Sequence, residues 1–121
     1  MSDIEKFADK YIDFFEHDFL RDPQSYNRFF ENEEFPNDCR ALGFEMDCGE
    51  SFINAYGLTA WKDNLVLKES IERINDTTII GAALFSQWRY YNHWAYSDAT
   101  EETRQWFLIL LYRLKDIEQK K

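Results

Sequence analysis

Residues 85–98, FSQWRYYNHWAYSD, hold the side chains of this chain that are best suited to bind or transform a small molecule. Ser86, Arg89 and His93 follow one another at steps of three and four residues, so on a helix they share one face. A guanidinium binds anions, and an imidazole exchanges a proton near neutral pH. The spacing therefore predicts an anion or small-ligand pocket on a helix. Asn92, Trp88 and Tyr96 would line the rest of this pocket.

The sequence favours a structural interpretation over this pocket. The same stripe suits a polar seam between helices, in which Arg89 pairs with a carboxylate and His93 bonds a backbone carbonyl. A buried arginine is nearly always paired, so both interpretations predict an acidic partner for Arg89 from another helix. They differ in whether the stripe is open to a ligand.

Other motifs for catalysis or metal binding are weak. Asp13 and His17 are spaced like half of a metal site on a helix, but the chain has only 2 His to complete it. Cys39 and Cys48 follow neither a C-x-x-C motif nor a zinc-ribbon spacing, so we expect buried, reduced thiols. A glycine-rich phosphate loop, a G-x-S-x-G elbow and an H-E-x-x-H motif are all missing. We expect no metal and no cofactor, and the sequence favours binding over catalysis.

The net charge of −9 lies entirely in the first half of the chain. Residues 1–60 contain 14 Asp or Glu against 5 Lys or Arg, whereas residues 61–121 contain 9 of each class. Direct binding to nucleic-acid phosphates is disfavoured, because that affinity comes mainly from cations that replace counterions. A basic protein is the more natural partner.

A row of carboxylates on the first helix sharpens this expectation. Glu5, Asp9, Asp13 and Glu16 follow at steps of four, four and three residues, so neighbours rise by about 4.5–6 Å along one side of the helix. Nucleic-acid phosphates are spaced on a similar scale, so the row can imitate a strand in the basic groove of a nucleic-acid-handling enzyme. Alternatively, Lys6 and Lys10 interleave with the row as ordinary surface ion pairs.

The sequence therefore predicts a small acidic interaction protein that engages a basic partner through its N-terminal half, in its sharpest form as an inhibitor. Electrostatic steering would bring the partner in, and aromatic anchors would supply affinity. The expected contact residues outside the row are Tyr26, Phe29, Phe30, Glu31, Glu33, Glu34 and Phe35. The alternative function is a small enzyme or anion sensor built on Arg89 and His93.

No membrane or secretory segment is expected. Charges interrupt every apolar run near the N-terminus, and the longest runs, IIGAALF and WFLILLY, fall far short of the roughly 20 residues that cross a bilayer. The sequence favours a cytoplasmic location.

The elements that must position these residues are helices. Ser2 and Glu5 form a capping box before the first helix, and Asp22 caps a second helix, PQSYNRFFE, whose first residue is proline. Residues 31–38 are expected to form an acidic loop, and Asp38 to cap a short helix that ends near Gly43. For residues 39–57, a further helix over about 49–55 is favoured over a pair of strands around LGFEMDC.

The second half predicts three longer helices. One runs from about residue 59 to 75, and Asn75–Asp76 then caps a central helix over about 77–95, which is apolar nearly all round in its first half. Gly81 indicates a close contact with a neighbouring element. The last helix follows a capping box at Asp98 and Glu101. Its apolar stripe consists of Thr103, Trp106, Phe107, Leu110, Leu111, Leu114 and Ile117.

These elements predict an all-α fold: one domain over residues 1–121, a compact bundle of five or six helices around the central helix. The segment FSQWRYYNHWAYS, followed by TRQWFLILLYRL, resembles small uncharacterised bacterial helical domains that carry a W-R-Y-x-x-H-W segment. The resemblance covers about residues 40–117. It implies a compact helical fold and brings no activity to this chain.

Overall fold

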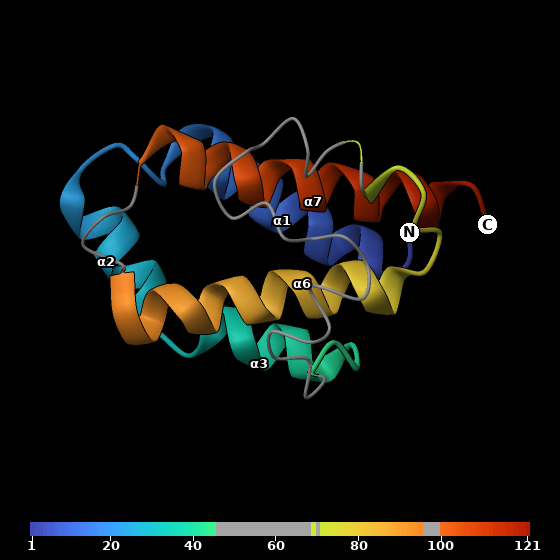
Figure 1. Cartoon of the computed structure of the whole chain (residues 1–121), viewed down its shortest axis with the longest axis horizontal. Helices are drawn as coiled ribbons and strands as arrows, with labels where there is room; N and C mark the ends of the chain where they lie inside the picture. Colours follow the sequence, from blue (N-terminus) through green and yellow to red (C-terminus); the bar gives the residue numbers. More distant parts are fainter. Residues whose placement is uncertain (46–68, 70, 96–99) are drawn as a thin grey trace.

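The computed structural model describes residues 1–45, 69, 71–95 and 100–121, and within these residues the chain forms helices and no strand (Figure 1). The predicted all-α class is thereby confirmed. The helices are α1 (Asp3–His17), α2 (Pro23–Glu31), α3 (Glu34–Ala41), α6 (Thr77–Tyr90) and α7 (Glu101–Gln119), with a π-helical turn η1 (Tyr91–Ala95) directly after α6.

The first and last helices lie side by side, and α6 runs beneath them (Figure 1). The helix α3 lies along the other side of α6, and α2 closes the end of the bundle where α6 passes into η1 (Figure 1). Because α6 has neighbours on several sides, all residues from 80 to 85 are buried, as expected for a central helix. The predicted apolar helix over about 77–95 is therefore the centre of the fold.

Local capping signals placed most helix starts correctly. Ser2 and Glu5 form the predicted reciprocal capping box of α1. The Oδ1 atom of Asp22 accepts a hydrogen bond of 2.9 Å from the Ser25 N–H, with Pro23 at the first helical position of α2. Asp76 caps α6 by accepting from the Thr78 N–H at 2.9 Å. These contacts use only residues within one turn, which explains why the sequence predicts them.

The predicted acidic loop over residues 31–38 is wrong for most of its length. The helix α3 starts at Glu34, whose N–H donates to Asn32 Oδ1 at 2.8 Å. Pro36 fits the first turn because the N–H groups there have no partner within the helix. Asp38 consequently lies inside the helix and caps nothing. The helix ends before Gly43, which has a φ of 76° and supplies the left-handed residue typical of such ends.

The predicted cap of the last helix also needs correction. Thr100 is the N-cap of α7, and its hydroxyl and that of Thr103 each accept from the other's backbone N–H. The predicted capping residue Asp98 lies outside the described residues, as do the proposed helix over 49–55, the strand alternative and most of the helix over 59–75. Within the last of these, Ile71 and Ile74 are buried.

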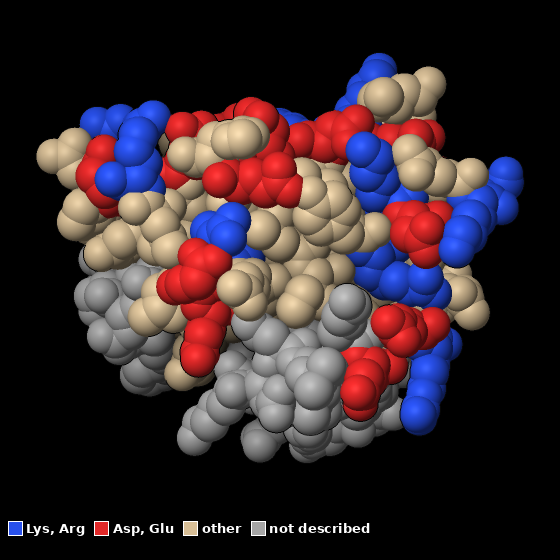
Figure 2. Space-filling model, turned by 90° about the horizontal axis from the view of Figure 1, so that it is seen from above, with Lys and Arg blue, Asp and Glu red and all other residues tan. Residues whose placement is uncertain are grey.

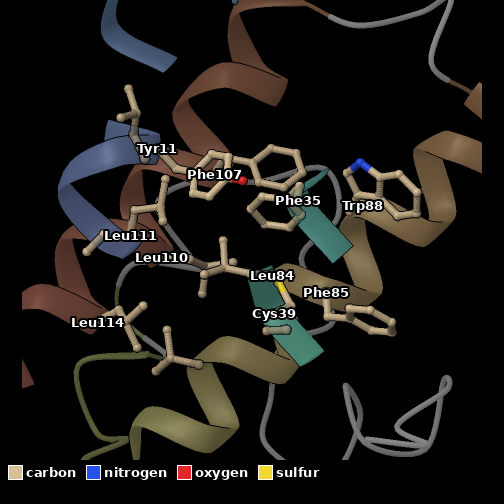
Figure 3. Close-up of a cluster of buried hydrophobic side chains, with 14 of the residues drawn as sticks. Tyr11, Phe35, Cys39, Leu84, Phe85, Trp88, Phe107, Leu110, Leu111 and Leu114 are labelled. Atoms are coloured by element: carbon tan, nitrogen blue, oxygen red, sulfur yellow. The ribbon is translucent and has the colours of Figure 1, made fainter. Parts of the chain in front are cut away.

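The core combines aromatic rings with leucine and other aliphatic side chains (Figure 3). Phe15 of α1 stacks on Phe107 of α7, with ring centroids 4.7 Å apart and an interplanar angle of 12°. Gly81 of α6 lies against the ring of Phe44, and a Cβ atom built on this glycine would stand 2.2 Å from Phe44 Cγ. The predicted close contact at Gly81 is thus with a side chain that follows α3.

Candidate functional site

Two polar side chains of the segment after Phe85 form hydrogen bonds to the end of α2. Trp88 is buried, and its Nε1 donates to the carbonyl of Phe29 at 2.9 Å. One turn further on, Asn92 Nδ2 donates to the carbonyl of Phe30 at 2.5 Å. Carbonyls in the last turn of a helix have no partner within it. Two of the predicted pocket residues therefore act as a remote cap for the end of α2.

Arg89 is exposed, so it differs from the buried, carboxylate-paired arginine that both interpretations assumed. Its guanidinium lies 5.8 Å from the ring centroid of Phe85, and that of Arg40 from α3 lies 5.5 Å from the same ring. An exposed guanidinium keeps its hydration and needs no buried partner. The prediction that Arg89 is buried is wrong because the second half of α6 is buried on one side only.

The rest of the predicted stripe is divided between the surface and the interior. Ser86 is half-buried and His93 is exposed, whereas Trp88 faces α2 and forms no wall beside them. Tyr96 lies outside the described residues. The structure therefore leaves Arg89 and His93 as surface groups one turn apart.

The π-helical turn η1 packs closely against α2 and α7. The ring of Tyr91 stacks on Phe30 with centroids 5.2 Å apart, and its hydroxyl is 3.0 Å from Thr103 Oγ1. Such turns recur at functional sites. In this chain the turn also has a structural use, because it joins α6 to both neighbours.

The predicted row of carboxylates on α1 is present, but each member has a partner within the protein. Glu5 completes the capping box, Asp9 Oδ1 is 2.6 Å from Lys115 Nζ, and Asp13 Oδ1 is 3.7 Å from His17 Nε2. Glu16 accepts a hydrogen bond from the Tyr112 hydroxyl. On the face shown in Figure 2, acidic and basic side chains lie next to one another in several places. The row is therefore partly neutralised by α7.

The corner between α2 and α3 is more open. Glu31, Glu33 and Glu34 are all exposed. Glu34 Oε1 is 2.7 Å from Lys10 Nζ and Glu33 Oε2 is 3.8 Å from an Arg40 guanidinium nitrogen. Glu31 has no ion pair with any residue that the structure describes. This acidic corner, defined as Glu31, Glu33 and Glu34, places three exposed carboxylates among the predicted contact residues within four positions of the chain.

The prediction that aromatic side chains of α2 and α3 anchor a partner is wrong for the three phenylalanines. Phe29, Phe30 and Phe35 have relative exposures of 8%, 0% and 1%, so they belong to the core and cannot insert into a partner. Tyr26 is half-buried and packs against the same core. Apolar residues at helical spacing mark a buried face. Sequence alone did not show that the short helices α2 and α3 turn this face inward.

Four polar side chains join α1 to α3. Lys10 Nζ lies 2.7 Å from Glu34 Oε1 and 2.8 Å from Asp38 Oδ2, and the Tyr11 hydroxyl donates to the same Asp38 oxygen at 2.6 Å. Burial opposes ionisation of Asp38, but the hydrogen bonds from Lys10 and Tyr11 outweigh it and lower its pKa. Burial and the bond to Asp38 raise the pKa of Tyr11. We call this group the α1–α3 clasp; no local pattern in the sequence indicates it.

A hollow of about 290 Å³ lies beside the clasp, between α1 and α2. Its apolar floor includes Phe14, Tyr11 and Phe29. The charged and polar lining residues are Lys10, Asp18, Arg21, Ser25, Arg28, Asn32 and Glu34. Neither Arg89 nor His93 takes part in it. No pattern in the sequence indicates this hollow, because its walls come from different helices.

The described residues offer no metal site: no three His, Cys, Asp or Glu side chains among them are grouped to hold an ion. Cys39 is buried and burial raises the pKa of its thiol, while Cys48 lies outside the described residues. Among the helices described, none is both long and apolar enough to cross a membrane.

Models of known protein families, characterised proteins and solved structures were compared with the chain, and none of them matches it. The resemblance to helical domains with a W-R-Y-x-x-H-W segment stays a prediction. Any function must therefore be argued from the geometry of the described residues.

Proposed function

We propose that this chain is an acidic interaction protein of the cytoplasm that binds a basic protein partner through its N-terminal half. The observation that carries the proposal is the exposure of the acidic corner. The side chains of Glu33 and Glu34 are 69% and 58% exposed, and Glu31 is exposed beside them. In the same half, Asp13 on α1 is 74% exposed.

Electrostatic attraction would dominate this interaction. Because Phe29, Phe30 and Phe35 are buried, the partner meets carboxylates before it meets large apolar groups. Charge complementarity raises the association rate and is weakened by salt. The sharpest form of the proposal is inhibition of a nucleic-acid-handling enzyme whose basic groove takes the acidic surface in place of phosphates. Nucleic acid itself would not be bound.

Charge reversal tests the proposal with a matched control. The variant E31K/E33K/E34K reverses the acidic corner, and E69K/E72K/E102K makes the same change in net charge at three exposed positions of the second half. Partners captured by the wild type from the native host would be identified, purified and titrated with each variant. We expect the corner variant to lose most affinity and the control to keep it. Equal affinity of both variants for the partner would overturn the proposal.

The alternative, a sensor or enzyme built on Arg89 and His93, has less support. Both residues are exposed, and a site that works on a small ligand normally encloses most of it. Thermal shift across anions and small metabolites, with wild type and His93→Ala side by side, is the test of this alternative.

A further inference from the structure

The hollow between α1 and α2 has an aromatic floor. Phe14 of α1 is half-buried and stacks on Phe29 of α2, with ring centroids 5.2 Å apart and an interplanar angle of 25°. The volume of about 290 Å³ is at the lower end of the range for small-molecule pockets. This size and floor suit a ligand with one aromatic ring and a short polar arm.

The charges around the hollow are unequally matched. Asp18 Oδ1 is 2.9 Å from Arg21 Nη1, and Glu34 Oε1 is 2.7 Å from Lys10 Nζ, so both carboxylates of the lining already have a cation. Arg28 is exposed, and among the residues that the structure describes it has no ion pair. Arg28 is therefore the one cation of the lining without a carboxylate partner among the described residues, although the net charge of the protein is −9.

An amide adds to the anion-binding character of this wall. Asn32 uses its Oδ1 to accept from the Glu34 N–H at 2.8 Å, which leaves its side-chain NH₂ as a donor. Arg28 and Asn32 stand four residues apart at the end of α2, so both lie on the side that borders the hollow. A guanidinium with a neighbouring amide is a good partner for a carboxylate.

We propose that the α1–α2 hollow binds a free small-molecule aromatic carboxylate, with its ring on Phe14 and its carboxylate on Arg28. The ring would bury the exposed part of the Phe14–Phe29 pair, and the carboxylate would neutralise the unmatched guanidinium. The hollow and the acidic corner share Glu34 but differ in the charge that they bind, since the hollow takes an anion and the corner takes a cation. Either proposal can therefore fail without the other.

Three probes of one shape provide the test on the full-length chain. Phenylacetate, phenylacetamide and phenethylamine present the same ring with a negative, neutral and positive arm. Backbone amide shifts would be followed by NMR while each probe is added up to about 20 mM, since an exposed site of this kind binds at about millimolar Kd. We expect saturable shifts along α1 and α2 with phenylacetate, and weaker binding of the other two.

Two arginine variants locate the carboxylate. Arg28→Gln should weaken phenylacetate binding by about fivefold, which corresponds to roughly 1 kcal/mol for an exposed ion pair. Arg73→Gln removes another exposed arginine, which does not line the hollow, and should change nothing. Phe14→Leu should weaken all three probes, because it removes the aromatic floor.

Several results would overturn the proposal. One is that phenylacetate causes no saturable shift, and another is that Arg28→Gln and Arg73→Gln bind it equally. Preference for phenethylamine would assign the hollow to a cation instead. Tighter binding of the tripeptide Gly-Gly-Phe than of phenylacetate would assign it to a peptide C-terminus and not to a free small molecule.

Discussion

The indole Nε1 of Trp88 donates a hydrogen bond to the backbone carbonyl of Phe29, 59 residues earlier in the chain. The bond is buried, and it supplies a donor to a carbonyl in the last turn of α2 that has no partner within the helix. Asn92 does the same for the next carbonyl, of Phe30. Trp88 and Asn92, which lie in the segment FSQWRYYNHWAYSD, thus cap the C-terminal end of α2, a helix from a distant part of the sequence.

Removing this donor should destabilise the protein. Trp88→Phe keeps an aromatic ring but leaves the Phe29 carbonyl buried without a donor and creates a small cavity, so we expect the free energy of unfolding to fall by about 2–4 kcal/mol. Urea titration measures this change. Arg89→Gln, one residue along and exposed, should stay within about 0.5 kcal/mol of the wild type. Equal stability of Trp88→Phe and wild type would show that the bond is dispensable.

Gly81→Ala should destabilise the protein although alanine is the better helix former. The added Cβ would meet the Phe44 ring at 2.2 Å, and overpacking of this kind costs about 1–3 kcal/mol against a gain of about 1 kcal/mol in helix propensity. Thermal unfolding of a double-mutant cycle tests the cause. In a Phe44→Ala background the ring is gone, so the same change should become stabilising by up to about 1 kcal/mol. A persistent loss there would point away from Phe44.

The α1–α3 clasp should make stability depend on pH in the acid range. The pKa of Asp38 is lowered in the folded state, so its contribution is complete above the unfolded-state pKa of about 3.9 and is lost as pH falls through the folded-state value. Its side chain is 37% exposed, so the contribution at pH 7 should not exceed about 1 kcal/mol. Urea titrations of wild type and Asp38→Asn should therefore converge as the pH falls below the unfolded-state pKa.

The matched control for the clasp is Glu31→Gln, an exposed carboxylate without an ion pair to any described residue. Its stability difference from the wild type should stay flat over the same pH range. A parallel loss in both variants would mean that general charge, and not the clasp, sets the acid dependence.

Cys39 should react slowly in the folded protein. Its side chain is fully buried and burial raises the pKa of the thiol, which lowers the thiolate fraction. In a Cys48→Ser background, labelling by a disulfide reagent at pH 8 should be slower than for a peptide thiol by a factor on the order of 100 or more, and urea should remove the difference. Fast labelling without urea would show that the α3 region opens readily.

Features set by a single turn could be predicted from the sequence. The caps at Ser2, Asp22 and Asp76 and the buried stripes of α1 and α7 depend on neighbours within four residues. The start of α3 could not be predicted, because an acidic run with proline is compatible with both a loop and a first helical turn. Thr100 was missed since Asp98 offered an equally good cap two residues earlier.

The candidate sites were harder to predict, since each depends on which helices meet. Helical spacing places Phe29 and Phe35 on apolar faces, but only packing shows that those faces turn inward. Arg28 has an ordinary surface position in the sequence, and its unmatched charge matters only beside Phe14 of another helix. Trp88 and Asn92 likewise acquire their role from carbonyls far away in the chain.

The pairing of α1 with α7 has a consequence for synthesis. Arg104 of α7 donates to the Phe15 carbonyl of α1 across a separation of 89 residues, and the Phe15–Phe107 stack spans a similar distance. Chains grow at about 5–20 residues per second, so the part of the apolar stripe of α1 that packs on α7 stays uncovered for roughly 5–20 seconds. The burial of α1 is therefore complete only after α7 has been synthesised.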